Sequence, residues 1–267
     1  MENWKFLNYN QDLKTTLSNF QKAAGIHKNV RTEFMKMVES KELKGMKYFD
    51  VANHIESLVE KYSKETPGAG IGFPVGLSIN ECAAHWTPNP GEKRIWEELD
   101  LVKVDYGVHV DGCIIDSAFT CSLSDDYNQL IEVSKKSTEL AIKNSGVDAV
   151  LGDIGGIVEE FIESQEVEIR GQLYPLKSVR NLTGHLIFPY LIHGPKSIPN
   201  FKIAYPVRME ENEFYAVETF PTTGTGKTTM DLEVSHYMIN TDRIVKNMDK
   251  DGGFPRLGVR ENFLFKK

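Results

Sequence analysis

The chain has 267 residues, of which 40% are hydrophobic and 26% are charged, and its formal net charge is −7. This composition is typical of a soluble globular protein, and an acidic chain does not attract nucleic acid or anionic membranes through its bulk charge. Its three cysteines lack metal-ligand spacing, and its N-terminus lacks a basic and then apolar leader. We therefore expect reduced thiols and a cytoplasmic protein, with neither nucleic acid nor a membrane as partner.

The predicted elements mix helix and strand along the whole chain. Up to about residue 65, apolar residues recur at intervals of three and four, which predicts helices. Glycine and proline are frequent from Pro67 onward, which indicates loops and a short strand. The later expectations are strands over 101–110 and 113–121, helices over 126–143 and 152–164, and a strand-rich region over 166–217. Because no linker divides the chain, we expect one α+β domain over residues 1–267.

The stretch VDYGVHVDGCIIDSAF, residues 104–119, places two aspartates in runs that resemble half-buried strands. Its Asp-Gly pair at 111–112 favours a tight hairpin turn, since such a turn needs positive φ at both central residues. Pairing outward from the turn predicts that Asp105 opposes Ala118 and that Asp116 lies two positions nearer the turn. Side chains alternate along a strand, so both carboxylates would share one face as diagonal neighbours, with backbones about 7–8 Å apart.

Carboxylates on the inward face of strands need partners, because burying an unpaired charge is costly. Two metal ions about 3.5–4 Å apart would fit between such carboxylates. Alternatively, both aspartates accept hydrogen bonds from amides of turns or loops, and their spacing alone leaves both interpretations open. Other polar residues also stand in apolar or aromatic runs: His85, His185, His193, Glu218 and His236. Each would be unremarkable alone, but together they favour a site.

Several blocks of the sequence resemble, in order and spacing, the signature blocks of type 2 methionine aminopeptidases: GFPVGLSINECAAHWTPN, VDYGVHVDGCIIDSAFT, NLTGHLIFPYLIHGPKSIP, and FYAVETF followed by EVSHYM. The resemblance covers about residues 10–265. It implies a pita-bread α+β fold, in which a pseudo-twofold pair of half-domains encloses a dinuclear metal site. It also implies removal of the initiator methionine from nascent polypeptides whose next residue is small, with the ribosome as a further candidate partner.

The resemblance also implies roles for individual residues. Four of the family's five metal ligands are matched by position, by Asp105, Asp116, His185 and Glu218. Both catalytic histidines, which also bind the substrate at the scissile peptide, are matched by His85 and His193. Positions around the methionine side-chain pocket are matched by Phe73, Ile192, Phe220 and His236. A donor set of mostly oxygen atoms suits manganese, iron or cobalt, with zinc as a further candidate, and such an ion activates water for amide cleavage.

The sequence departs from the family's pattern at its C-terminus. Residues 226–267 resemble the start of the family's helical insertion, and no glutamate matches the fifth, bridging ligand of the final strand. We therefore expect a fold truncated at the C-terminus, although a fragment or a frameshifted reading of a longer protein would end in the same way. A metal held by Asp116, His185 and Glu218 would keep three ligands, enough for an open catalytic site. A second metal, held by Asp105 and Asp116 alone, would bind weakly or not at all.

Other functions remain open at this point. A catalytically impaired pita-bread protein could act as a binding module. A proline-specific peptidase of the same fold is the weaker alternative, because those enzymes have different signature spacings and usually an additional N-terminal domain. The segment TTGTGKTT, residues 222–229, resembles a phosphate-binding loop, but that motif requires glycine where Pro221 stands. We expect an exposed turn there and no bound nucleotide.

Overall fold

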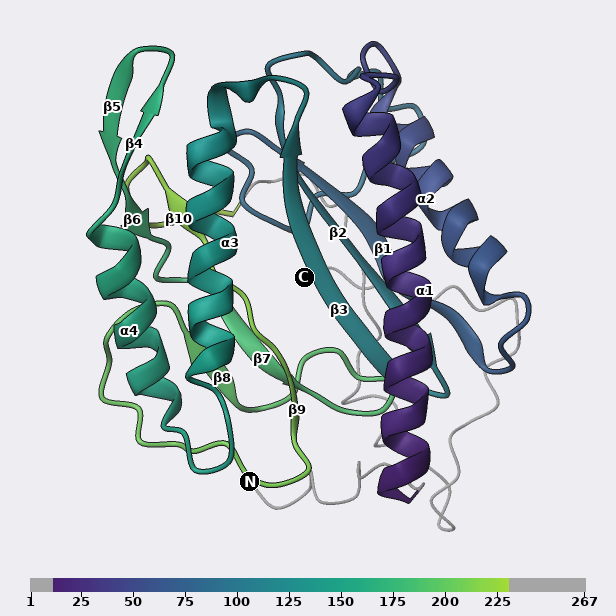
Figure 1. Cartoon of the computed structure of the whole chain (residues 1–267), viewed down its shortest axis with the longest axis vertical. Coiled ribbons are helices and arrows are strands. Elements are labelled where there is room, and N and C mark those ends of the chain that lie inside the picture. The colour runs from purple at the N-terminus through teal and green to yellow at the C-terminus, as the bar shows by residue number, and fades with distance from the viewer. Residues whose placement is uncertain (1–11, 231–267) are drawn as a thin grey trace.

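The first half of the chain forms two helices that pack against an antiparallel sheet (Figure 1). The computed structural model describes residues 12–230, and the elements of this half are α1 (Leu13–Glu39), α2 (Tyr48–Ser63), β1 (Ala69–Ile79), β2 (Leu101–Val110) and β3 (Cys113–Ser122). β2 is the central strand, α1 packs on β2 and β3, and α2 packs on β1. The helices expected up to residue 65 and both expected strands are confirmed.

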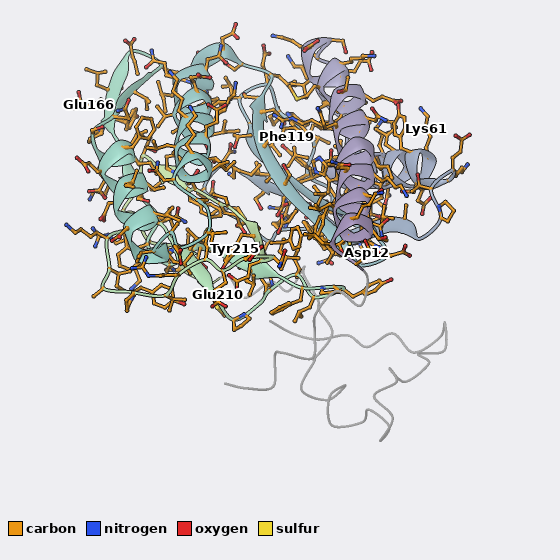
Figure 2. The ribbon with its side chains drawn as sticks, turned by 60° about the horizontal axis from the view of Figure 1, so that its bottom comes forward. Asp12, Lys61, Phe119, Glu166, Glu210 and Tyr215 are labelled. Atoms are coloured by element: carbon orange, nitrogen blue, oxygen red, sulfur yellow. The ribbon has the colours of Figure 1, made fainter. Side chains whose placement is uncertain are left out.

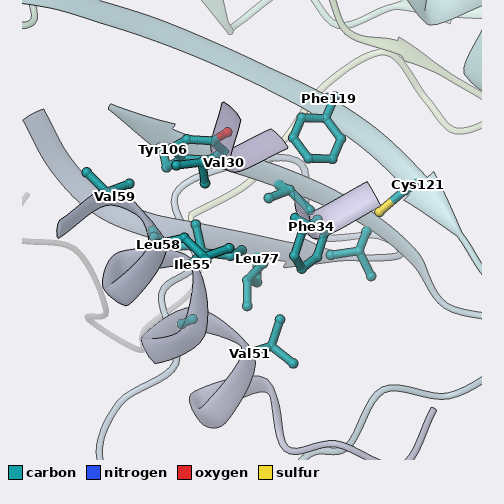
Figure 3. Close-up of a cluster of buried hydrophobic side chains, with 14 of the residues drawn as sticks. Val30, Phe34, Val51, Ile55, Leu58, Val59, Leu77, Tyr106, Phe119 and Cys121 are labelled. Atoms are coloured by element: carbon teal, nitrogen blue, oxygen red, sulfur yellow. The ribbon is translucent and has the colours of Figure 1, made fainter. Parts of the chain in front are cut away.

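Helix α1 follows directly from its sequence. It begins after Asp12, whose carboxylate accepts a hydrogen bond from the Thr15 N–H at 3.0 Å and so caps the helix. Buried side chains then recur at intervals of three or four residues: Ala23, Ile26, Val30, Phe34 and Val38. This face packs with apolar side chains of α2 and of the sheet, several of which Figure 3 shows around Ile55 and Leu77. Each large side chain buried in this way contributes about 1.5–3 kcal/mol.

The β2–β3 hairpin has the predicted geometry. Asp111 and Gly112 have φ values of 48° and 81°, the positive values that the tight turn requires. Asp105 is paired with Ala118 and Gly107 with Asp116 in a register without shifts. The alternation of side chains therefore places both aspartates on the face of the sheet opposite to the one that α1 covers.

The second half contains a short 3₁₀ turn, two helices and several short strands. Its elements are η2 (Asp125–Tyr127), α3 (Asn128–Lys143), α4 (Leu151–Glu163), β4 (Glu166–Ile169), β5 (Gln172–Pro175), β6 (Lys177–Ser178), β7 (Thr183–Ile187), β8 (Ser197–Pro199), β9 (Phe214–Ala216) and β10 (Pro221–Thr222). β7 lies between β8 and β9, β6 pairs with β10, and β4 pairs with β5 in a hairpin that projects from this half (Figure 1). Both predicted helices are confirmed.

The strand-rich prediction for 166–217 is confirmed only in part. Residues 200–213 contain no strand, in keeping with Pro206 and a polar run just before β9, since proline cannot donate to a sheet ladder. β9 also ends at Ala216, so Glu218 follows a strand rather than lying within one. The segment 222–229 continues from β10 as an irregular turn, and Lys227 is exposed as expected.

Each half has its own hydrophobic core. A smaller apolar cluster combines residues from both halves: Ile114, Ile187 and Ala216, with Phe73 and Ile192 packed against them. Figure 2 shows the charged residues Lys61 and Glu166 at opposite edges of the molecule. Most of the predicted insertion, from residue 231 onward, and His236 lie outside the described residues.

Across residues 12–230, none of the helices is both long enough and apolar enough to span a bilayer.

Candidate metal centre

Two carboxylates enter the candidate centre from the β2–β3 hairpin. Asp105 opposes Ala118 and Asp116 opposes Gly107, so the carboxylates are diagonal neighbours on the face directed at the second half. The Oδ1 atom of Asp105 is buried and has no hydrogen-bond partner among the described residues. Burial, together with the nearby charges of Asp116 and Glu218, raises the pKa of Asp105 well above its ordinary value. No amide of the described turns or loops therefore satisfies this oxygen of Asp105.

An imidazole and a third carboxylate come from the second half. His185 lies on β7 and is paired with Ala216 of β9, so Glu218 follows two residues later beside the histidine ring. The Nε2 atom of His185 is 2.9 Å from Glu218 Oε1 and 3.4 Å from Asp116 Oδ2. The side chains of His185 and Asp116 are only 7% and 11% exposed. Residues separated by about a hundred positions thus meet at one imidazole nitrogen.

The donor atoms of these three residues could hold one cation. One atom each from Asp116, His185 and Glu218 lie within 4.8 Å of one another. Burial lowers the pKa of His185, but the hydrogen bonds and charges of Asp116 and Glu218 outweigh it and raise the pKa to about 9. The surroundings therefore favour positive charge at this point. Two carboxylates, one imidazole and the unsatisfied Asp105 oxygen beside them fit a divalent ion such as manganese, iron or cobalt.

The structure brings several other predicted residues to this region. The ring of His193 makes an edge-to-face contact with that of His185, with centroids 4.3 Å apart. The ring of Phe73 lies over Gly107, where an added Cβ would come within 2.4 Å of it. Phe73 and Ile192 both pack against the small apolar cluster shared by the halves. An apolar surface therefore adjoins the carboxylates and the two histidines.

The other predicted residues within residues 12–230 are His85 and Phe220. His85 is exposed, with φ +65°, on the loop after β1. This loop runs beside the part of β1 opposite Asp105, because the Trp86 carbonyl accepts a hydrogen bond from Leu77 N–H at 2.8 Å and Gly76 is paired with Asp105. Phe220 is not part of the shared apolar cluster; its carbonyl accepts a hydrogen bond from Val179 N–H at 3.0 Å.

The structure also reveals supporting residues that the sequence motifs did not indicate. Thr219, next to Glu218, contacts hydroxyl groups of α3 at 2.8 Å (Ser137) and 2.6 Å (Thr138). These contacts anchor the segment that carries Glu218 on the second half. On the other side of the hairpin, His27 of α1 contacts backbone carbonyls of β2 and β3. The sequence gives only weak signals for these supporting residues. Ser137 and Thr138 are hydroxyl residues on one face of a predicted helix, and His27 is a histidine within the apolar face of another.

Comparison with known proteins identifies the class to which this fold and site belong. The model of metallopeptidase family M24 matches residues 18–247. The chain is a member of this family of metal-dependent peptidases, and it has the pita-bread fold. The family likeness extends through both halves described above.

The resemblance to type 2 methionine aminopeptidases is confirmed by individual relatives. Methionine aminopeptidase 2-1 of Fusarium vanettenii is 45% identical over 237 residues, which are 86% of this chain and 52% of that protein. Methionine aminopeptidase 2 of Saccharomyces cerevisiae is 46% identical over 225 residues, or 81% of this chain and 52% of the relative. The chain thus spans about half the length of the curated relatives that it matches.

Solved structures support the same fold at low sequence identity. Methionine aminopeptidase from Rickettsia prowazekii superposes with a TM-score of 0.66 at 19% identity, covering 86% of this chain and 87% of that one. X-Pro aminopeptidase from Thermotoga maritima gives a TM-score of 0.56 at 18% identity, covering 77% and 53%. These likenesses concern the arrangement of helices and strands.

Proposed function

We propose that the protein is a metal-dependent aminopeptidase that removes the initiator methionine from nascent polypeptides in the cytoplasm. The observation that carries this proposal is the convergence of Asp116, His185 and Glu218 from the two halves of the fold, within 4.8 Å of one another. The identity to type 2 methionine aminopeptidases over more than four-fifths of the chain supports the choice of substrate.

In this proposal, different residues of the chain bind the metal, bind the substrate and assist the leaving group. Asp116, His185 and Glu218 hold one divalent ion firmly, and Asp105 with Asp116 offers a second, weaker position. A divalent ion held there supplies Lewis acidity and activated water for amide hydrolysis. His193, whose ring contacts that of His185, would bind the substrate carbonyl. His85 would contact the scissile peptide and help its nitrogen leave.

The apolar surface next to the carboxylates would select the substrate. Phe73 and Ile192 pack on one cluster together with Ile187, and an unbranched thioether side chain fits such an irregular apolar surface well. In the family's pattern, the positions that Phe220 and His236 match also lie around this pocket. A methionine side chain bound there would place the first peptide bond of a nascent chain against the metal centre.

Turnover of short peptides tests the proposal. We expect the full chain, stripped with a chelator and reloaded with Mn²⁺, to release methionine from Met-Gly-Xaa peptides and to cleave Leu-Gly-Xaa peptides much more slowly. Removing the side chain that would help the peptide nitrogen leave, with His85→Ala, should lower kcat by roughly 10²–10⁴-fold. Asp116→Asn should abolish turnover.

His54→Ala, on α2 away from the candidate centre, serves as the matched control and should retain the activity of the unsubstituted chain. Absence of methionine release with manganese, cobalt, iron and zinc alike would contradict the enzymatic proposal and favour a binding module.

A further inference from the structure

A buried histidine lies behind the two aspartates of the hairpin. His27, on α1, is only 4% exposed. Its Nε2 atom is 3.2 Å from the carbonyl oxygen of Tyr106 and 3.0 Å from that of Ser117. Both partners are acceptors, so Nε2 carries the hydrogen and donates to the two carbonyls at once. A single N–H thus joins helix α1 to both strands of the hairpin.

The Tyr106 side chain fixes this histidine in place. The two rings are stacked with centroids 4.0 Å apart and an interplanar angle of 5°. The Tyr106 hydroxyl donates a hydrogen bond of 2.9 Å to the His27 carbonyl oxygen. Burial lowers the pKa of His27 to about 4, so the ring stays neutral at ordinary pH. The contact between helix and hairpin is therefore reciprocal and does not depend on charge.

The position of the contact along the hairpin is informative. Tyr106 and Ser117 are paired in the β2–β3 register, and this pair lies between the pair that contains Asp105 and the pair that contains Asp116. Because side chains alternate, Tyr106 points toward α1 while both aspartates point toward the second half. The His27 N–H therefore contacts the sheet from the face that α1 covers. Along the hairpin, this contact lies between the positions of Asp105 and Asp116, whose carboxylates are on the opposite face.

We propose that His27 is a positioning residue that sets the relative placement of Asp105 and Asp116, and through them the metal affinity of the centre. The part of this inference that concerns metal rests on the proposed function, whereas the part that concerns the hairpin does not. A buried donor at this point is costly unless it is bonded. An apolar residue of similar size could fill this position but could not donate a hydrogen bond to the two carbonyl oxygens.

Paired substitutions at this residue test the inference. His27→Leu keeps apolar bulk and removes the donor, and His27→Gln keeps an N–H at a similar reach. Thr16→Val, at another buried polar position of α1, is the matched control. We expect His27→Leu to weaken Mn²⁺ binding roughly tenfold or more in calorimetry on the folded protein, the range seen when groups behind metal ligands are removed. His27→Gln should stay within about threefold of the unsubstituted chain, and Thr16→Val should match it.

Amide hydrogen exchange in the presence of a chelator provides a readout that does not depend on metal. We expect exchange across residues 104–119 to be about tenfold faster in His27→Leu, with little change in His27→Gln, since opening of the hairpin loses one hydrogen-bonded link. Exchange in this hairpin that is unaltered by His27→Leu overturns the inference. If the unsubstituted chain bound no Mn²⁺, the proposed function would fail, and the exchange result would still decide the role of His27.

Should His27→Leu not fold, ¹⁵N-histidine spectra of the unsubstituted chain replace it. A slowly exchanging Nε2–H resonance for His27 supports the bond to both strands. A ring protonated at Nδ1 instead contradicts it.

Discussion

At the scale of single residues, His185 links metal binding to proton binding. Its pKa is raised to about 9 by Asp116 and Glu218 although burial opposes the shift. A metal ligand must be a neutral imidazole, so a cation has to displace this proton. Metal affinity should therefore rise with pH up to about pH 9. Asp105 acts in the same direction, because burial and the nearby charges of Asp116 and Glu218 raise its pKa and so disfavour the carboxylate form that a cation requires.

In the presence of a chelator, the free energy of unfolding should fall as the pH rises from about 6.5 to about 9. The folded pKa of His185 lies above its ordinary value of 6.5, so the protonated ring stabilises the folded state fully below about pH 6.5 and this contribution is lost toward pH 9. The loss amounts to about 3 kcal/mol. Urea denaturation at a series of pH values measures it. His185→Asn should lack this component, and equal pH dependence in both proteins would contradict the assignment.

At the scale of elements, helix α4 approaches the backbone after β8 through its glycines. A Cβ on Gly155 would come within 2.6 Å of the Phe201 carbonyl oxygen and 2.7 Å of the Pro199 carbonyl oxygen. These atoms are backbone and cannot rotate away. β8 pairs with β7, which carries His185, so the close packing of α4 supports the strand that supplies the imidazole to the centre.

Adjacent glycines of α4 should therefore respond differently to alanine. Gly155→Ala is expected to destabilise the protein by roughly 1–3 kcal/mol, because the added methyl group overpacks the interface. For Gly156, the nearest atom to an added Cβ is 3.6 Å away, on the Lys202 side chain. Gly156→Ala should be neutral or stabilise by about 0.5–1 kcal/mol, since alanine favours helix. Chemical denaturation of the two variants measures this, and similar effects at both positions would argue against the backbone contact.

At the scale of the whole molecule, the candidate centre exists only where the two halves meet. The first half supplies Asp105 and Asp116, and the second supplies His185 and Glu218. Contacts that join the halves include the stacked rings of Phe20 and Phe214, 4.2 Å apart. Tyr190 N–H also donates to the Gly112 carbonyl oxygen at 3.1 Å. Folding of both halves is therefore required before the donors converge.

A ligand that binds only the assembled centre must stabilise the folded chain. Mn²⁺ at one hundred times its dissociation constant should raise the free energy of unfolding by about 2.7 kcal/mol. Asp116→Asn should remove this gain, whereas Glu139→Gln, at an exposed carboxylate of α3, should retain it. Thermal or urea denaturation with and without the metal provides the measurement. A gain that persists in Asp116→Asn would place the cation elsewhere.

The sequence by itself determined the parts of the protein that depend on near neighbours. The Asp-Gly pair at 111–112 and the alternation on either side of it were enough to predict the hairpin, its register and the common face of Asp105 and Asp116. Apolar periodicity predicted α1 and α2 in the same way, and helices were also expected where α3 and α4 lie. Turn geometry and side-chain alternation depend on only a few neighbouring residues, so a short stretch of sequence is enough to predict them.

Only the tertiary structure decided which residues form the centre. Sequence patterns marked His185 and Glu218 as out of place, but the 2.9 Å contact between them arises from the pairing of β7 with β9. The structure also groups Asp116 with these two as the clustered donors and leaves Asp105 as their neighbour. No sequence motif indicated the contact of His27 with the hairpin. Distances between residues far apart in the chain depend on how whole elements pack, and local backbone preferences do not carry that information.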